Sequence, residues 1–334
     1  MADRKENIMI TKFKAGDHNQ WLALRHEYLG GSDAAAACGQ NPYESPYSLW
    51  AKKTNKMPEF EGNLITEVGS FLEDFVAKYF TKMSGLKVQK SNYTWFNDLY
   101  PWACANIDRF IVGGDAGLEI KTTNSFENAA KFRKSEIPAT WFFQCVHYMM
   151  ITEKSTWYLA ALSGSRNFYI FCITLDEALE QPEWCNSLVR ITEDDIADLA
   201  EMEKDFWSHV ENKTEPPVDG SDATSDAINA VYPDSDGSDI DLGFISGNLI
   251  QLSAFKEQIK ELTRLKNLQE QNIKTFMKTA EKGHHAGYTV TYKVQSRTSF
   301  DYKALLKDFP NMGFDKYMKT TESRVLRVNK KGEE

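Results

Sequence analysis

ACANIDRFIVGGDAGLEIKTT, residues 103–123, contains two apolar runs separated by a glycine-rich segment at 113–117. This pattern predicts two β-strands joined by a turn. Side chains alternate between the two faces of a strand, so Glu119 and Lys121 are expected on one face and their apolar neighbours on the other. A turn of this size places the strand that carries Asp108 antiparallel to them, within cross-strand reach. The stretch therefore predicts part of a β-sheet with charged side chains on one face.

This charged face predicts a metal site with a cationic neighbour. Asp108 and Glu119, together with the main-chain carbonyl of Ile120, are oxygen ligands of the kind that hold one or two Mg²⁺ ions. Lys121 would hold or deprotonate an attacking water and stabilise negative charge on a phosphorane. The alternative is that both carboxylates face solvent in ion pairs with Lys121 or Arg109, because a D…ExK pattern is short and common.

A helix over 66–84 is expected to flank this face, with Gly85 as its C-cap. Its apolar residues follow helical spacing and predict a stripe that faces the core: Val68, Phe71, Leu72, Phe75, Val76, Tyr79 and Met83. Glu73 lies on the flank of this stripe, whereas Asp74 points away from it. Glu73 is therefore the acid expected to complete a second metal position or to orient the water.

After the hairpin, the sequence predicts a loop and then a helix over 139–151. On this helix Gln144 and Tyr148 share one face, which makes them candidates for the same site. His147 is interpreted as a hydrogen-bonded packing residue, because a histidine on a mostly apolar helix is seldom a ligand. The predicted loop carries three cations, Lys131, Arg133 and Lys134. These cations, with Tyr148, are candidates for contacts to a nucleic-acid backbone, or else they are solubility charges.

The rest of the pattern predicts three parts. Residues 1–210 form the main domain, in which strands over 156–173 extend the sheet. Residues 211–247 are polar and acidic and form a linker, and residues 248–334 form an extension. The elements expected in the extension are a long helix over 249–281, strands at 288–294 and 324–328, and a short helix at 302–306.

Composition limits the class of protein. The 334 residues carry a formal charge of −9, which disfavours a DNA-coating role more than it disfavours a localised cleft. No run of eighteen apolar residues suggests a membrane span, and the first residues lack an apolar signal segment, so we expect a cytoplasmic protein. The five cysteines are scattered, which indicates reduced thiols and disfavours a zinc site or an iron–sulfur cluster.

The chain contains four motifs in order. They are WLALRHEYLGGSDAAAACGQNPYESPYSLW (21–50), GSFLEDF (69–75), ANIDRFI with LEIKT (105–111 and 118–122) and WFFQCVHYM (141–149). These motifs resemble those of the YqaJ-type viral recombinase nucleases, which are similar to phage lambda exonuclease and belong to the PD-(D/E)xK superfamily. The resemblance covers about 18–175, and the tail at 287–305 looks like extensions in that family. It implies an α/β fold whose restriction-endonuclease-like core is a mixed central sheet flanked by helices, with a C-terminal helix and β-hairpin extension.

The resemblance also implies roles for individual residues. The catalytic positions fall on Glu73, Asp108, Glu119, Lys121 and Gln144. Arg25 and Ser32 match, with the same seven-residue separation, the arginine and serine that hold a DNA 5′-phosphate. The amides of Gly30 and Gly31 suit such an anion pocket, although an arginine such as Arg25, taken alone, is more often a solvated residue on a helix. The sequence departs from the family at Val146, where a second glutamine often stands.

The function that the resemblance implies is an Mg²⁺-dependent 5′→3′ exonuclease, with Mn²⁺ as a possible substitute, acting on linear double-stranded DNA. It would leave 3′ single strands for recombination in a bacterial or phage-infected cell. The family further implies a homo-oligomer, a trimer around DNA, and a single-strand annealing protein as partner. Two alternatives are a PD-(D/E)xK endonuclease or defence-processing nuclease, and a non-catalytic protein that binds DNA ends.

Overall fold

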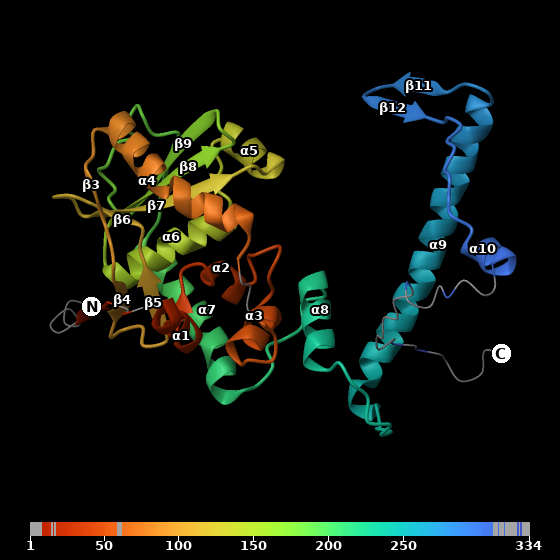
Figure 1. The fold of residues 1–334 in the computed structure, drawn as a ribbon, viewed down its shortest axis with the longest axis horizontal. Helices are drawn as coiled ribbons and strands as arrows, with labels where there is room; N and C mark the ends of the chain where they lie inside the picture. Colours follow the sequence, from red (N-terminus) through yellow and green to blue (C-terminus); the bar gives the residue numbers. More distant parts are fainter. Residues whose placement is uncertain are drawn as a thin grey trace. The chain divides into compact units, whose positions relative to one another are not determined.

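The computed structural model describes residues 9–14, 16, 18–58, 62–309 and the single positions 313, 317, 326 and 328. The chain forms two compact units, Met1–Tyr232 and Pro233–Glu334 (Figure 1). Their boundary falls inside the predicted acidic linker. Part of that linker is helix α8 (Asp222–Val231) of the first unit, where the hydroxyl of Thr224 donates a hydrogen bond to Ser45 Oγ at 2.7 Å.

The first unit is built on a six-stranded mixed sheet in the order β10-β9-β8-β7-β6-β3. Its strands are β3 (Val88–Lys90), β6 (Arg109–Ile111), β7 (Ala116–Thr123), β8 (Thr156–Ser163), β9 (Asn167–Thr174) and β10 (Ser187–Arg190). β7 runs parallel to β8, and β9 parallel to β10, whereas the other neighbours are antiparallel. The predicted strands over 156–173 are confirmed as β8 and β9.

Two long helices cover opposite faces of this sheet (Figure 1). They are α4 (Leu64–Ser84) and α6 (Ala139–Thr152), close to the bounds predicted for both. On β8, Trp157 packs in the core beneath α6, and the next residue, Tyr158, packs in the core beneath α4. The alternation of a strand thus separates two apolar cores. Asn63 and Thr66 form a capping box at the start of α4.

A smaller sheet in the order β1-β4-β5-β2 lies in the same unit. Its strands are β1 (Ile10–Phe13), β2 (Leu29–Gly30), β4 (Thr94–Asn97) and β5 (Ala103–Asn106). The prediction that one continuous strand carries Asp108 is therefore wrong, because β5 belongs to the small sheet and β6 belongs to the large one. Asp108 lies between them, where its carboxylate Oδ2, rather than its main chain, accepts a 2.8 Å hydrogen bond from the Ile120 amide.

Two local predictions are corrected by side-chain and cap contacts. The segment predicted as a loop with cations is helix α5 (Phe126–Arg133), because the hydroxyl of Ser125 accepts a hydrogen bond from the Asn128 amide and caps it.

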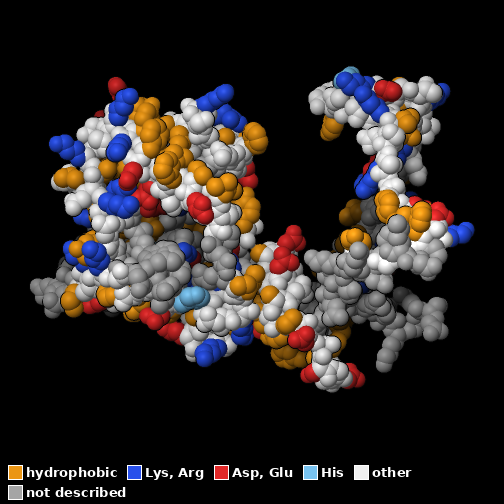
Figure 2. Space-filling model, viewed as in Figure 1, with side chains coloured by type: hydrophobic (Ala, Val, Ile, Leu, Met, Phe, Trp, Pro, Cys, Tyr) orange, Lys and Arg blue, Asp and Glu red, His pale blue; other side chains and the backbone are white. Residues whose placement is uncertain are grey.

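The apolar stripe of α4 does not face the core along its whole length. Val76 is fully buried, but Phe71 is 85% exposed, and Figure 2 shows hydrophobic side chains gathered over α4.

The remaining elements complete both units. The first unit also contains α1 (His18–Glu27), α2 (Ala34–Ala37), α3 (Pro46–Lys53) and α7 (Glu193–Asn212). The second contains η1 (Gly243–Ile245), α9 (Ser246–Met277), β11 (Lys282–His285), β12 (Tyr288–Thr291) and α10 (Tyr302–Asp308). The predicted strand at 324–328 lies largely outside the described residues. The α/β class, with a mixed sheet flanked by helices and a C-terminal helix and hairpin, is confirmed. In the described part of the chain, no helix is long and apolar enough to span a membrane.

Candidate active site

A cavity of about 490 Å³ in the first unit brings together most of the predicted site residues. Those that line it are Arg25, Gly30, Gly31, Ser32, Glu73, Asp108, Glu119, Ile120, Lys121, Gln144 and Tyr148. They come from the end of α1, the segment around β2, α4, the turn before β6, β7 and α6. Segments that are far apart in the sequence thus meet at one cavity.

Asp108 and Glu119 form a buried pair of carboxylates. Glu119 is only 3% exposed, and its Oε1 forms a 2.8 Å ion pair with Lys121 Nζ. Burial raises the pKa of Asp108 well above its usual range, and the nearby negative charge of Glu119 raises it further. Two carboxylates and one ammonium leave excess negative charge when both carboxylates are ionised, and a bound cation would stabilise that form.

The donor set fits a hard divalent cation. Glu119 Oε2 is buried and has no hydrogen-bond partner, so one carboxylate oxygen remains for a ligand. Among the described residues, no three His, Cys, Asp or Glu side chains are grouped to hold a metal. The candidate set is therefore Asp108 and Glu119 with the main-chain oxygen of Ile120, which suits Mg²⁺ because this ion keeps several waters beside one or two carboxylates.

A chain of hydrogen bonds connects Lys121 to α6. Lys121 Nζ donates to Gln144 Oε1 at 2.8 Å, and Gln144 Nε2 donates to the Tyr148 hydroxyl at 2.8 Å. Burial alone would lower the pKa of Lys121, but the charges of Glu119 and Asp108 outweigh burial and raise that pKa. Lys121 is therefore a protonated donor, held in place by Glu119 and by Gln144.

Glu73 lies at the edge of this cluster and is engaged by two cations. Its Oε1 is 2.5 Å from Arg109 Nη1 and 3.3 Å from Lys90 Nζ. Arg109, whose side chain is only 4% exposed, also pairs with Asp74 at 2.5 Å. The sequence did not identify Arg109 as the residue that ties α4 to β6, because the partners are 35 and 36 positions apart in the chain.

Arg25 and Ser32 meet at the wall of the same cavity. Arg25 Nη2 donates to Ser32 Oγ at 3.5 Å and lies 4.0 Å from Asp33 Oδ1. Beneath them, the buried carboxylate of Asp33 pairs with Lys53 Nζ at 2.7 Å. Lys53 Nζ also donates to the main-chain carbonyls of Arg25 and Tyr28. Lys53 therefore joins both halves of the Arg25–Ser32 pair, a role that the sequence gave no reason to expect.

Other candidates lie away from the cavity. Lys131, Arg133 and Lys134 are on or just after α5 and are not among the described residues that line it, and Lys131 pairs with Glu127 at 2.9 Å. Val146, at the position where a second glutamine is often found, is buried in the core.

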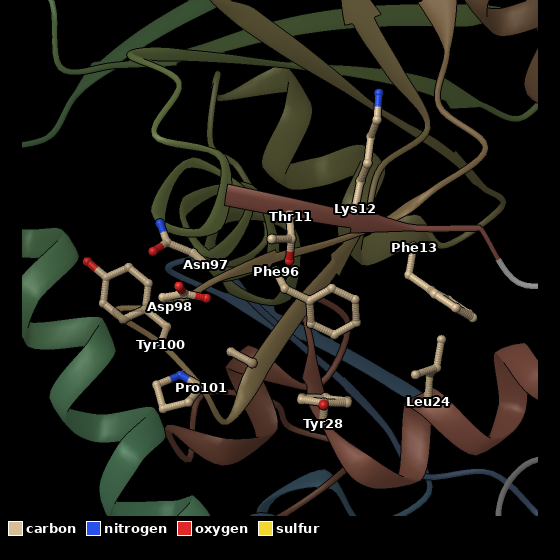
Figure 3. Close-up of a pocket in the computed structure, with 11 residues that line it drawn as sticks. Thr11, Lys12, Phe13, Leu24, Tyr28, Phe96, Asn97, Asp98, Tyr100 and Pro101 are labelled. Atoms are coloured by element: carbon tan, nitrogen blue, oxygen red, sulfur yellow. The ribbon is translucent and has the colours of Figure 1, made fainter. Parts of the chain in front are cut away.

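A second cavity, of about 580 Å³, lies between β1, β4 and α1 (Figure 3). Phe13, Leu24 and Phe96 give it an apolar side. Its only charged lining residues among those described are Lys12 and Asp98, so it lacks the carboxylate pair that metal chemistry needs.

The contact between Gly31 and Tyr148 gives a testable consequence. A Cβ atom on Gly31 would overlap the Tyr148 ring, whereas one on Gly30 would meet only Asp33 Oδ2 at 3.7 Å. Gly31→Ala is expected to displace the Tyr148 ring and lower stability by about 1–3 kcal/mol. Urea unfolding of this variant and of Gly30→Ala would check the prediction, and equal stability of the two variants would contradict it.

The fold and the cavity define a class: an α/β protein whose mixed sheet carries a buried carboxylate–lysine cluster beside an arginine–serine pair. Residues 20–155 match the family model described as YqaJ-like viral recombinase domain. The chain is also 32% identical over 330 residues to the uncharacterized protein YqaJ of Bacillus subtilis strain 168, covering 97% of this chain and 98% of that protein. The chain therefore belongs to the YqaJ family.

Two solved structures are similar to parts of the chain. One is an alkaline exonuclease, LHK-Exo, from Laribacter hongkongensis, which is 15% identical with a TM-score of 0.46 and matches 58% of this chain and 93% of its own. The other is a phage-related exonuclease from Haemophilus somnus 129PT, which is 12% identical with a TM-score of 0.40. The match covers 58% of this chain and 99% of that protein's chain.

Proposed function

We propose that the chain is a metal-dependent deoxyribonuclease that degrades linear double-stranded DNA from its 5′ ends. It would release mononucleotides and leave 3′ single strands for recombination by annealing. The observation that carries this proposal is that one cavity contains both a buried carboxylate–lysine cluster and an arginine–serine pair suited to a phosphate. Membership of a family of viral recombinases supports the same role.

Asp108 and Glu119 are the proposed metal ligands, with the Ile120 carbonyl as a further donor and Glu73 at a second position. A bound Mg²⁺ supplies polarisation of the phosphodiester and a water of lowered pKa. Lys121 is oriented by Glu119 and Gln144 and is protonated, so it donates hydrogen bonds to a water or to a phosphate oxygen on which negative charge develops. Lys121 would hold or deprotonate the attacking water and stabilise this negative charge.

Arg25 and Ser32 are the proposed holders of the terminal 5′-phosphate. A guanidinium group and a hydroxyl offer several donors to one phosphate. A phosphate held there would place the chain end in the same cavity as the carboxylates. This arrangement explains why hydrolysis would start at an end rather than within a strand.

The class of activity is tested with linear and closed circular duplexes of one sequence, incubated with Mg²⁺, Mn²⁺ or EDTA. We expect acid-soluble nucleotides from the linear duplex with either metal and none with EDTA, because the buried carboxylates need a cation to bind the phosphodiester. Robust cutting of the circle would contradict the exonuclease assignment and favour an endonuclease. No hydrolysis with either metal would favour a non-catalytic protein that binds DNA ends.

Lys53 offers a test of the phosphate pocket that leaves the pocket's own side chains in place. Lys53→Met removes the ammonium that binds Asp33 and the Arg25 carbonyl, so the pocket should lose its shape. We expect the ratio of kcat/KM for 5′-phosphate over 5′-hydroxyl ends to fall by about tenfold, equivalent to about 1.4 kcal/mol. Lys52→Met is the matched control, because Lys52 pairs with Glu44 instead. A ratio unchanged by Lys53→Met would contradict the assignment.

Three further parts of the proposal rest on the family resemblance. They are a homotrimer that encloses the DNA, a single-strand annealing protein as partner, and action in the cytoplasm of a bacterial or phage-infected cell. Lys131, Arg133, Lys134 and Tyr148 remain proposed contacts to the DNA backbone. Tyr148 is buried and accepts a hydrogen bond from Gln144, so its hydroxyl would reach DNA only inside the cavity.

A further inference from the structure

A third cavity, of about 510 Å³, opens directly beside the candidate active site. The two cavities share Glu73, Asn106 and Asp108 among their lining residues, so these side chains form a common wall. Arg25 lines only the active-site cavity, and Lys14 lines only its neighbour. The two cavities therefore form a depression of two adjacent parts, with the acidic residues between them.

The part of the third cavity beyond the common wall is polar and basic, and we call it the basic groove. It is lined by Lys14, Lys90, Ser91, Asn92, Tyr93 and Thr94, with the apolar Ile107 beside them. Both of its charged residues are lysines, and the Lys90 side chain is 54% exposed while pairing with Glu73 at 3.3 Å. The Tyr93 side chain is 39% exposed, and Lys12 Nζ lies 4.7 Å from the centre of its ring.

The basic groove is fixed relative to the carboxylates by main-chain contacts. Strand β3 ends at Lys90, which pairs in register with Arg109 on β6. The Ser91 amide donates to the main-chain carbonyl of Asp108 at 3.3 Å, and Trp95 Nε1 donates to Ser91 Oγ at 3.0 Å. The backbone that carries Lys90 is therefore held beside Asp108, a proposed metal ligand.

Along this depression the charges run from Arg25, through the carboxylates, to the lysines. A polyanion fits such an order if one phosphate lies at each cationic end and one, with a cation, lies at the carboxylates. We propose that the basic groove binds the DNA strand on the 3′ side of the bond to be cleaved, with Lys14 and Lys90 on its phosphates and Tyr93 against a base. This proposal rests on the proposed function, which places the terminal nucleotide between Arg25 and Asp108.

The test uses Lys14→Gln and 5′-phosphorylated DNA of increasing length, from a dinucleotide to a long duplex. On the long duplex we expect KM to rise roughly eightfold at 0.1 M salt, since one phosphate contact changes the salt exponent by about 0.9. The slope of log KM against log salt should fall by about 1. The dinucleotide should be hydrolysed by the variant as by the wild type, because it has no phosphate on the 3′ side of the cleaved bond for Lys14 to bind. Lys82→Gln is the control, since Lys82 lies over the Tyr79 ring and lines neither cavity among the described residues.

If Lys14→Gln lowered the rate of hydrolysis equally on the dinucleotide and on the long duplex, the groove assignment would be overturned. An unchanged slope of log KM against log salt would also overturn it. Failure of the wild type on every length would instead contradict the proposed nuclease itself. A second measurement needs no charge variant: photocrosslinking with 5-iododeoxyuridine placed at single positions of the strand. Crosslinks to Tyr93 are expected from the second or third nucleotide, and crosslinks from the terminal nucleotide alone would overturn the proposal.

Discussion

Replacing Lys121 with alanine is expected to lower kcat for nucleotide release by about 10²- to 10³-fold, the usual cost of losing one donor aimed at developing charge. The reason is that Lys121 Nζ is fixed between Glu119 Oε1 and Gln144 Oε1, at 2.8 Å from each. Its loss removes the cationic donor from a site that otherwise contains two carboxylates. The measurement is single-turnover hydrolysis of a 5′-phosphorylated linear duplex, normalised to the fraction of folded protein.

The matched control for this variant is Lys154→Ala. Lys154 also forms a lysine–carboxylate pair, at 3.0 Å with Asp115, just before the opposite end of β7. We expect that variant to keep wild-type activity, because exposed ion pairs contribute little and this one lies outside the active-site cavity. A Lys121→Ala protein that degrades linear DNA as fast as the wild type would show that the proposed active site is wrong.

Replacing His147 with alanine is expected to destabilise the first unit by about 3–5 kcal/mol, the usual cost of leaving one charge of a buried pair without its partner. His147 Nε2 donates to the Cys104 carbonyl at 2.9 Å, and Nδ1 lies 2.8 Å from Glu203 Oε1. Both side chains are fully buried, and Glu203 Oε2 has no hydrogen-bond partner. His147 thus joins α6 to β5 and to α7, as a packing residue rather than a ligand.

The contribution of His147 should depend on pH in a defined direction. Burial alone would lower the pKa of His147, but the charge and hydrogen bond of Glu203 outweigh it and raise that pKa above 6.5. Stability from a raised pKa is fully present below the unfolded value of about 6.5 and is lost as pH rises through the folded value. Urea unfolding of the wild type and of His147→Ala should be measured from below about pH 6.5 upward. The difference between their free energies of unfolding should become smaller as the pH rises.

The control for this second prediction is His209→Ala. The His209 side chain lies at the surface of α7, where Nδ1 is 3.1 Å from Thr214 Oγ1. Its replacement is expected to change the free energy of unfolding by less than about 0.5 kcal/mol. If His147→Ala lowered the free energy of unfolding no more than His209→Ala does, the proposed role of the buried ion pair would be contradicted.

The parts of the fold that sequence could predict are those governed by local periodicity. Alternation along β7 placed Glu119 and Lys121 on one side of the strand, and helical spacing placed Glu73 toward the site on α4. Gly85 gave the C-terminal end of α4 where it is found, whereas the helix starts at Leu64, after the Asn63 cap, two residues before the predicted start. The four motifs also indicated the family, which the comparison with Bacillus subtilis YqaJ confirms.

The parts that sequence could not predict depend on contacts between distant segments. The break between β5 and β6 arises because the chain passes from one sheet to another, which no local pattern records. Arg109 and Lys53 act through partners on other elements, so neither stands out in the sequence. Phe71 on α4 is exposed, although helical spacing placed it in the apolar stripe. Spacing predicts which residues share a face of the helix, but it does not predict whether another element packs against that face.

The most direct test of the central claim follows the two strands of one duplex separately. A linear duplex with a 5′-phosphate on one strand and a 5′-hydroxyl on the other is incubated with Mg²⁺, and mononucleotides are measured from each labelled strand. We expect faster loss of the phosphorylated strand from its 5′ end, and a smaller difference between the rates for the two strands in the Arg25→Ala variant. Release from 3′ ends, or equal rates for both strands in the wild type, would contradict this prediction.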